Sequence, residues 1–149
     1  MLSNIFVSYK EILVPFDGSS FAKRAYNKAL DIAQVQDSTI TVIIIIKKEY
    51  PPIVGFSKMQ PKLMAAHQKH AKKQIENLKD VAEKRNISFH SKIKQGTSVA
   101  KEILDFIKNH RFDLIVMGSH GRTGFKKLVL GSVTNGIIQH ARCPVMVTR

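Results

Sequence analysis

The chain has 149 residues, of which 44% are hydrophobic and 23% charged, as is typical of one folded domain with its own core. It contains no run near the ~20 apolar residues of a membrane span, no signal-peptide pattern, and one cysteine, so we expect a cytoplasmic protein without a membrane partner. The net charge of +13, from 24 basic and 11 acidic residues, favours anionic partners such as nucleotides, nucleic acid or a membrane surface. The lysines are spread along the chain, which favours a solvated surface over a dedicated nucleic-acid patch.

The first half of the chain alternates buried strands with amphipathic helices. EILVPF, residues 11–16, predicts a buried strand that ends in the turn DGSS. A helix follows over about 20–34, with apolar residues at helical spacing and Ser19 or Ser20 as its N-cap. TITVIIII, residues 39–46, is apolar on both sides, which is typical of a central strand covered on both faces.

The middle of the chain carries its longest predicted loop. Residues 49–62 hold three prolines and a glycine, which predicts a mobile lid or partner surface. A long basic helix is expected over about 63–85, and its inner stripe holds Ala71, Ile75, Leu78 and Ala82. The alternation in residues 86–94 predicts a half-exposed strand.

The last third repeats the same alternation. Gly96 turns the chain into a helix capped by Thr97 or Ser98, and DLIVM, residues 113–117, predicts another buried strand. A short helix over 132–140 and a final strand in CPVMVTR, residues 143–149, complete the order β-α-β-α-β-α-β-α-β. Repeated right-handed crossovers of this kind predict an α/β fold with one parallel sheet and helices on both faces.

Two strand ends carry the residues expected to form a site. Ligands of open α/β sheets bind beyond the carboxyl ends of the strands, where the strand order reverses. The first strand ends in Asp17 and the fourth in Gly118, so both face one crevice if the two strands are neighbours. Asp17 as a simple cap of the first helix is an equal alternative.

A glycine-rich loop, GSHGRTGFKKLVLGS at 118–132, predicts an anion site. Gly118, Gly121 and Gly131 would let backbone N–H groups approach an oxyanion, and Ser132 adds a hydroxyl at the start of a helix whose dipole favours negative charge. Arg122, Lys126 and Lys127 add positive charge. Turn formation by the glycines, helix capping by Ser132 and simple solvation of the cations remain the alternatives.

Other motifs can be excluded. The sequence lacks G-x4-G-K-[ST], G-x-G-x-x-G after the first strand, and G-x-S-x-G. His67 and His70 lie three residues apart on the long helix, but no further ligand joins them to form a metal site. His120 is the only candidate general base, so we expect no catalytic residue and at most slow ATP hydrolysis.

Gly118-x2-Gly121-x9-Gly131-Ser132 resembles the G-x2-G-x9-G-[ST] signature of the universal stress protein family. KEILVPFDGS, DLIVMGSHGRTG and LGSVTNGIIQHARCPVMV lie in the order expected for that family, so the resemblance covers residues 10–149 and leaves 1–9 as an N-terminal extension. It implies a Rossmann-like fold of the adenine nucleotide alpha hydrolase type with strand order 3-2-1-4-5.

The resemblance also implies a ligand and an assembly. Members with the intact signature bind ATP, and many form homodimers through the last strand. By analogy, Asp17 would contact the ribose or a magnesium ion on the phosphates. The backbone near Pro15 and Ile45 would frame the adenine, and the ribose and phosphates would be lined by Met117, Gly118, Gly121, Gly131, Ser132 and Val133, with Arg122 nearby.

Two features depart from the family. The second strand carries isoleucines where a histidine is frequent, and the charge of +13 is high. The sequence therefore predicts an ATP-binding protein that acts in stress response or signalling. A basic nucleic-acid-binding or chaperone-like protein and a sensor of AMP or a cyclic nucleotide are the alternatives.

Overall fold

The computed structural model describes residues 6–49, 56–122 and 129–149, and gives the backbone alone for 56–59. Strands and helices alternate along the chain, in the order β1 Glu11–Pro15, α1 Ser20–Gln36, β2 Thr39–Lys47, α2 Phe56–Lys84, β3 Ser88–Gly96, α3 Val99–Lys108, β4 Leu114–Gly118, α4 Ser132–His140 and β5 Val145–Thr148.

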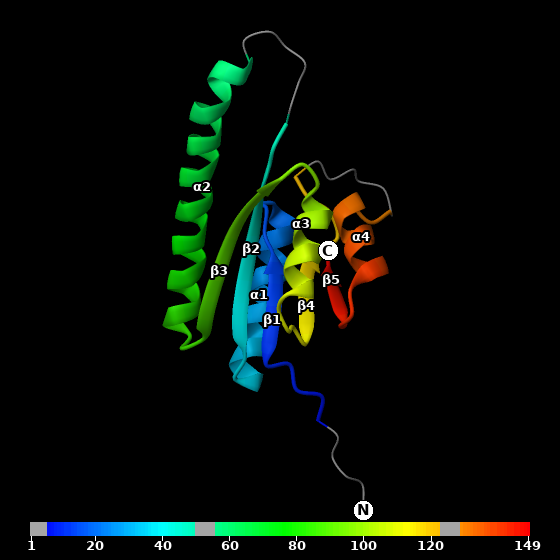
Figure 1. Ribbon diagram of the computed structural model, residues 1–149. Helices are drawn as coiled ribbons and strands as arrows, with labels where there is room; N and C mark the ends of the chain where they lie inside the picture. Colours follow the sequence, from blue (N-terminus) through cyan, green and yellow to red (C-terminus); the bar gives the residue numbers. More distant parts are fainter. Residues whose placement is uncertain (1–5, 50–55, 123–128) are drawn as a thin grey trace, which may run out of the picture.

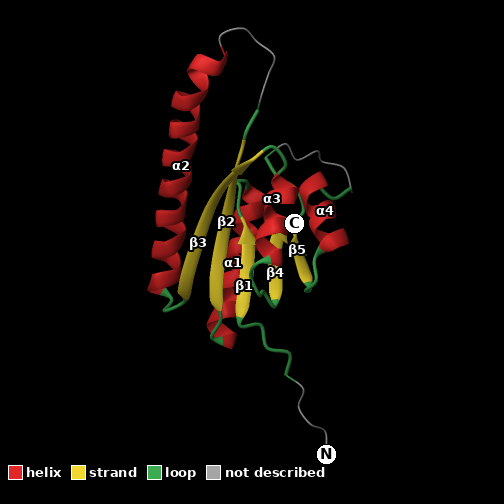
Figure 2. Ribbon diagram, viewed as in Figure 1, coloured by secondary structure: helices red, strands yellow, loops and turns green. Residues whose placement is uncertain are grey.

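The five strands form one parallel sheet in the order β3-β2-β1-β4-β5, which confirms the predicted α/β fold. β1 pairs with β2 on one side and with β4 on the other, so the strand order reverses between β1 and β4. Figures 1 and 2 show α1 and α2 on one face of the sheet and α3 and α4 on the other.

Two cores fill the space between the sheet and its helices. Successive strand residues point to opposite faces, so Ile12 and Val14 pack under α1 and α2, whereas Leu13 packs under α3 and α4. The predicted inner stripe of the long helix is confirmed, because Ala71 and Ala82 are buried and Ile75 and Leu78 pack against the first core. Tyr26 of α1 donates its hydroxyl to the Leu78 carbonyl of α2, and burial raises the pKa of this phenol.

Side chains and turn residues set the helix ends as expected. Ser19 Oγ accepts from the Ala22 N–H at 3.1 Å and caps α1, and Ser98 Oγ caps α3 through the Lys101 N–H at 3.3 Å. α1 ends at Asp37, whose φ of 54° is left-handed. Asn86 adopts a similar φ of 56°, and β3 begins two residues later.

The predicted start of the long helix was wrong. α2 begins at Phe56, seven residues before the expected start at 63, and includes Pro61. Proline is unfavourable inside a helix because it lacks an N–H, which is why the sequence indicated a loop here. Pro61 lies in the second turn and is exposed, so its ring reduces the helical hydrogen bonding close to the helix start only. Residues 50–55 of the predicted loop lie outside the described residues.

The chain before β1 joins the domain at Tyr9. The Tyr9 N–H donates to Gln36 Oε1 at 2.6 Å, and its carbonyl accepts from Ser38 Oγ at 2.5 Å. Phe6 and Val7 are exposed. No helix within the described ranges combines the length and apolarity that crossing a membrane would require.

Candidate functional site

The turn after β1 and the loop after β4 meet at one edge of the sheet. Ile12 pairs with Leu114 and Leu13 with Ile115, so the two strands end side by side. Asp17 lies two residues beyond the end of β1, and Gly118 is the last residue of β4. The predicted neighbourhood of these two segments is therefore present in the structure.

Asp17 bridges the two segments. One carboxylate oxygen accepts from the Ser19 N–H at 2.9 Å and the other from the Arg122 N–H at 3.1 Å. Arg122 Nε in turn donates to the Asp17 carbonyl at 2.5 Å. Asp17 thus supports the turn before α1, whereas Ser19 is the residue that caps the helix.

Two of the three signature glycines lie where a side chain would disturb this arrangement. A Cβ atom on Gly121 would lie 2.9 Å from Asp17 Oδ2. A Cβ atom on Gly131 would lie 3.3 Å from the His120 Cα and the Ser119 carbonyl oxygen. Position 121 therefore needs a small residue so that the loop can contact the Asp17 carboxylate. Position 131 needs one so that the end of the loop can approach Ser119 and His120.

Gly118 has a different role in the structure. A Cβ atom there would lie 2.6 Å from the Cβ and 2.8 Å from the carbonyl carbon of Phe21 on α1. The Gly118 carbonyl accepts from Thr134 Oγ1 at 2.8 Å, and this bond ties β4 to α4. Close packing of α1 on β4 is thus sufficient reason for this glycine, and its contact with a nucleotide stays a prediction.

The base of the glycine loop is closed by hydrogen bonds that sequence reasoning missed. The Gly131 N–H donates to the Ser119 carbonyl at 2.8 Å. The ring nitrogens of His120 contact Ser119 Oγ at 3.0 Å and the Val129 carbonyl at 2.5 Å. The His120 ring also lies 5.3 Å from that of Phe21. His120 therefore holds the two ends of the loop together.

The start of α4 presents backbone donors toward this loop. Gly131 is the N-cap residue, and no side chain among the described residues caps the helix. The first amides of a helix have no partner within it, and those of Ser132 and Val133 have no backbone acceptor among the described residues, so they could donate to an anion. Ser132 is the first residue of the helix and is exposed, so it does not act as its N-cap.

The apolar residues of the predicted site lie on the α3–α4 side of the sheet. Met117, Ile45 and Val133 all border the core under these two helices. Pro15 is buried at the end of β1 and pairs with Ile43 in register. The structure therefore brings the apolar residues of the prediction to one side of the crevice. Lys126 and Lys127 lie outside the described residues.

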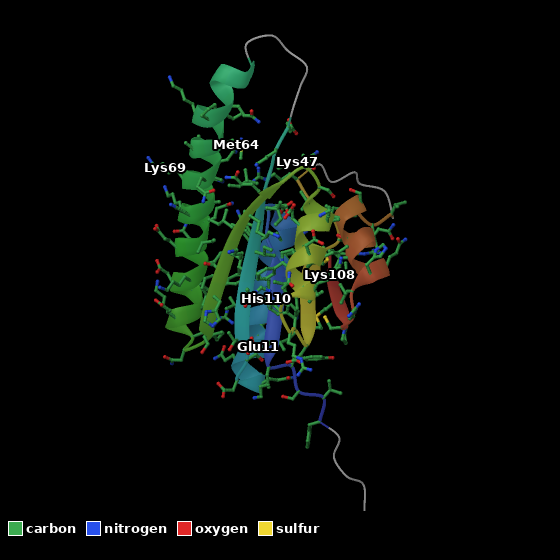
Figure 3. The ribbon with its side chains drawn as sticks, in the orientation of Figure 1. Glu11, Lys47, Met64, Lys69, Lys108 and His110 are labelled. Atoms are coloured by element: carbon green, nitrogen blue, oxygen red, sulfur yellow. The ribbon has the colours of Figure 1, made fainter. Side chains whose placement is uncertain are left out.

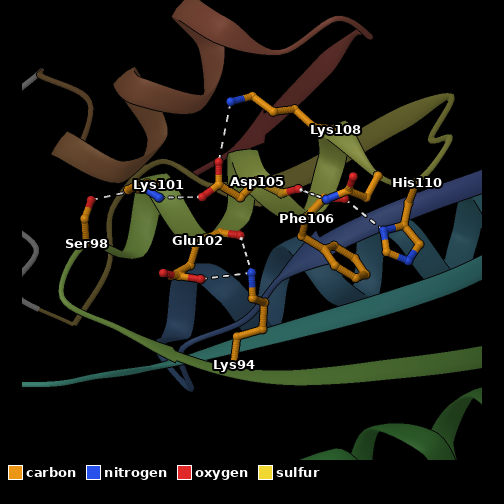
Figure 4. A network of polar contacts seen from close by, with 9 residues as sticks. Lys94, Ser98, Lys101, Glu102, Asp105, Phe106, Lys108 and His110 are labelled. Atoms are coloured by element: carbon orange, nitrogen blue, oxygen red, sulfur yellow. Dashed lines mark hydrogen bonds and ion pairs between the residues drawn. The ribbon is translucent and has the colours of Figure 1, made fainter.

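An ion pair between β3 and α3 lies next to Ile45. Ile45 pairs in register with Lys94 of β3, whose Nζ lies 2.9 Å from Glu102 Oε2 on α3 (Figure 4). A Cβ atom on Gly96 would lie 2.4 Å from Glu102 Cγ, so a side chain here would displace Glu102 from its present position beside Lys94. Further along α3, the hydrogen bond between Lys101 and Asp105 raises the pKa of the lysine and lowers that of the carboxyl.

One residue of the long helix also reaches the crevice. A Cβ atom on Gly18, whose φ is 81°, would lie 2.5 Å from Gln74 Nε2 and 3.6 Å from an Arg122 guanidinium nitrogen. Gln74 and Arg122 therefore both approach the turn after β1. The sequence carries no signal for this contact, because Gln74 lies 56 positions away from Gly18 in the chain.

Two shallow hollows lie elsewhere on the described surface. One of about 390 Å³ lies between α2 and β3, and one of about 280 Å³ lies between the first turns of α2 and the ends of β2 and β3. Neither is lined by a residue of the predicted site. The candidate crevice is thus defined by its residues and backbone donors.

The sheet order and the crevice at its point of reversal define a Rossmann-like α/β protein. More specifically, the chain belongs to the universal stress protein family, whose model matches residues 8–149. It is 32% identical over 146 residues to universal stress protein MJ0531 of Methanocaldococcus jannaschii, covering 95% of this chain and 82% of that protein. The structure of UspA from Lactobacillus plantarum is 28% identical, with a TM-score of 0.87 over 95% of this chain and 99% of the other.

More distant solved structures share the fold. A universal stress protein from Archaeoglobus fulgidus in complex with dAMP is 19% identical with a TM-score of 0.64, and one in complex with cAMP is 16% identical with a TM-score of 0.62. Each match covers 95% of this chain and 98% of the other.

Proposed function

We propose that this universal stress protein binds ATP in the crevice between β1 and β4 and acts as a nucleotide-dependent module in stress response or signalling. The observation that carries the proposal is the meeting of Asp17 with Gly121 and Arg122 at the strand reversal. These groups suit a nucleotide whose ribose lies against the Asp17 carboxylate. Its phosphates would lie against the glycine loop and accept hydrogen bonds from the first amides of α4.

The distant relatives that hold dAMP and cAMP support an adenine nucleotide as the class of ligand. The donor set also fits magnesium carried on the phosphates, because a carboxylate oxygen is a ligand that Mg²⁺ prefers. Asp17 would hold that ion, which would neutralise part of the phosphate charge. The backbone near Pro15 and Ile45 would frame the adenine, and Met117 and Val133 would lie against the ribose and phosphates.

We propose binding and signalling as the role of the nucleotide, with hydrolysis slow at most. The one histidine near the loop, His120, has both ring nitrogens engaged by Ser119 and Val129. A group held in this way serves the closure of the loop, and activating a water molecule would require breaking one of these contacts.

We further propose a homodimer formed through β5. This strand is at the edge of the sheet, and its four residues are all half-buried. The carbonyls of Pro144 and Thr148 accept hydrogen bonds from β4, so the N–H groups of Val145 and Val147 point to the free edge. An unpaired edge is a template for a second strand, and the same edge of another copy would complete it.

Calorimetric titration of the purified chain with ATP tests the nucleotide proposal. Gly121→Val should weaken ATP binding tenfold or more, because the new side chain displaces the Asp17 carboxylate. Gly136→Ala is a suitable control, since its Cβ would lie at an ordinary 3.4 Å from the Ala100 Cβ, outside the crevice. Equal ATP affinity of Gly121→Val and the parent chain would show that the nucleotide does not bind here.

The same titration separates ATP from the alternative ligands. If the α4 amides bind the terminal phosphates, affinity should fall from ATP to ADP to AMP. Tighter binding of AMP or cAMP than of ATP would instead identify a sensor of the smaller nucleotide. Mass spectrometry of the small molecules released on denaturation would give an independent answer.

A further inference from the structure

The part of α2 up to residue 75 carries basic residues and no acidic one. Residues 50–75 contain no acidic residue, whereas the last part of the helix holds Glu76, Asp80 and Glu83. Within the described side chains of the basic part, four exposed lysines follow one another, at Lys62, Lys69, Lys72 and Lys73. The helix therefore has a longer basic part followed by a shorter part of mixed charge.

Three of these lysines face away from the sheet. Lys62, Lys69 and Lys73 are separated by seven and four residues, which places them along one line of the helix, opposite the buried Ala71. Figure 3 shows Lys69 on the outer side of α2 and Met64 on the side toward the sheet. The line extends over roughly 16 Å at 1.5 Å per residue.

The fourth lysine extends this surface toward the sheet. Lys72 lines the groove of about 390 Å³ between α2 and β3, together with the acidic Glu76. We call Lys62, Lys69, Lys72 and Lys73 the basic face.

The ion pairs of the described residues leave the basic face untouched. They join Lys79 to Glu83, Arg85 to Asp31, Lys94 to Glu102, and Lys101 and Lys108 to Asp105. The acids of these ion pairs thus neutralise cations elsewhere on the surface. The lysines of the basic face have no ion-pair partner among the described residues, and Glu76 is the one acid that lines the groove with Lys72. An anionic partner would reduce the mutual repulsion of these lysines.

We propose that the basic face binds the phosphate backbone of double-stranded nucleic acid without reading its sequence. Aligned lysines with no intervening acid are complementary to a regular row of phosphates. The groove between α2 and β3 has Ile75 and Ile93 as its apolar residues and no aromatic ring, so it offers no platform for stacking unpaired bases. A duplex carries the denser row of charge, about one per 1.7 Å of its axis, and is therefore the favoured partner.

Two triple variants with equal loss of charge test the proposal. Lys69→Gln, Lys72→Gln and Lys73→Gln remove three cations from the basic face. Lys23→Gln, Lys28→Gln and Lys84→Gln remove three exposed lysines from outside it, which also make no ion pair within the described residues. Both variants have a net charge of +10, which is +13 less three lysines. Any difference between them is therefore due to the position of the charge.

Fluorescence anisotropy with a labelled duplex of about 20 base pairs, at salt from about 50 to 200 mM, gives affinity and its salt dependence. The basic-face variant should bind the duplex at least about tenfold more weakly than the parent chain. Its slope of log affinity against log salt concentration should fall by roughly one for each lysine removed. The affinity of the control variant should change less than about twofold. ATP titration should give the parent affinity for both variants, so this test succeeds or fails separately from the proposed nucleotide site.

Three results would overturn the proposal. The first is no binding of the duplex by the parent chain at low salt. The second is an equal loss in both variants, which would mean that net charge alone attracts the nucleic acid. The third is binding to vesicles containing phosphatidylserine that depends on the basic face while duplex binding does not, which would assign the surface to a membrane.

Discussion

Asp17 and Arg122 hold each other across the crevice by two reciprocal bonds. The Asp17 carboxylate accepts from the Arg122 N–H at 3.1 Å, and Arg122 Nε donates to the Asp17 carbonyl at 2.5 Å. These residues are 105 positions apart in the chain and belong to the two segments that the proposed ligand would contact. An incoming nucleotide with magnesium would therefore compete for groups that already bind each other.

This relationship makes Asp17 a sensitive position. Asp17→Ala should weaken ATP binding about tenfold to a hundredfold with Mg²⁺ present, since a hydrogen bond to a charged group contributes about 1.5–3 kcal/mol. The loss of ATP affinity without Mg²⁺ should be smaller, because the Asp17 carboxylate then has no metal ion to hold. Calorimetric titration in both conditions measures this, with the exposed Asp31→Ala as a control. Equal losses with and without the metal would contradict a metal-linked role.

Gly118 should matter for stability whatever the ligand. Gly118→Ala places a Cβ atom 2.8 Å from the Phe21 backbone, which cannot rotate away as a side chain end could. We expect the free energy of unfolding to fall by about 1–3 kcal/mol, the usual cost of overpacking. Urea denaturation measures this value. Gly136→Ala on α4 should instead be neutral or stabilise by up to about 1 kcal/mol, since alanine favours the helix.

The free edge of β5 gives a test of the proposed dimer. Val147→Pro removes an N–H that points away from β4, so it should prevent pairing with a second copy and leave the bonds to β4 in place. Light scattering after size-exclusion chromatography should report a dimer for the parent chain and a monomer for the variant. Val35→Lys changes an exposed apolar residue on α1 and should remain dimeric. A dimeric Val147→Pro variant with native circular dichroism would place the interface elsewhere.

Cys143 should react slowly with alkylating reagents. Burial raises the pKa of its thiol, and the negative charge of Asp113 raises it further. A raised pKa leaves less thiolate near pH 8, and the thiolate is the reactive form. Mass spectrometry after iodoacetamide treatment at this pH should show slower modification of the native than of the denatured chain. Equal rates in the two states would contradict this environment for the thiol.

The sequence predicted the elements that have regular apolar patterns. The run of isoleucines in β2 and the inner stripe of α2 each indicated their structure directly, because burial on two faces or on one stripe has a period that can be read from the residues. The strand order came from the family resemblance, since the residues alone do not specify which strands are neighbours.

Other features depend on contacts between distant residues. Pro61 indicated a loop by its local chemistry, yet the structure continues a helix through it. Gly118 belonged to a signature that suggested phosphate binding, but the packing of Phe21 against it is visible only once α1 lies on β4. The contact of His120 with Val129 likewise requires the loop to return to its own base.

β1 supplies side chains to both helical layers, with Ile12 and Val14 on one side and Leu13 on the other. Because neighbouring residues of β1 pack into different cores, the strand cannot move along its axis unless the side chains of both cores repack. A ligand that displaced the end of this strand would therefore shift side chains in both cores. Binding at one site would then change the packing of the helices on both faces of the sheet.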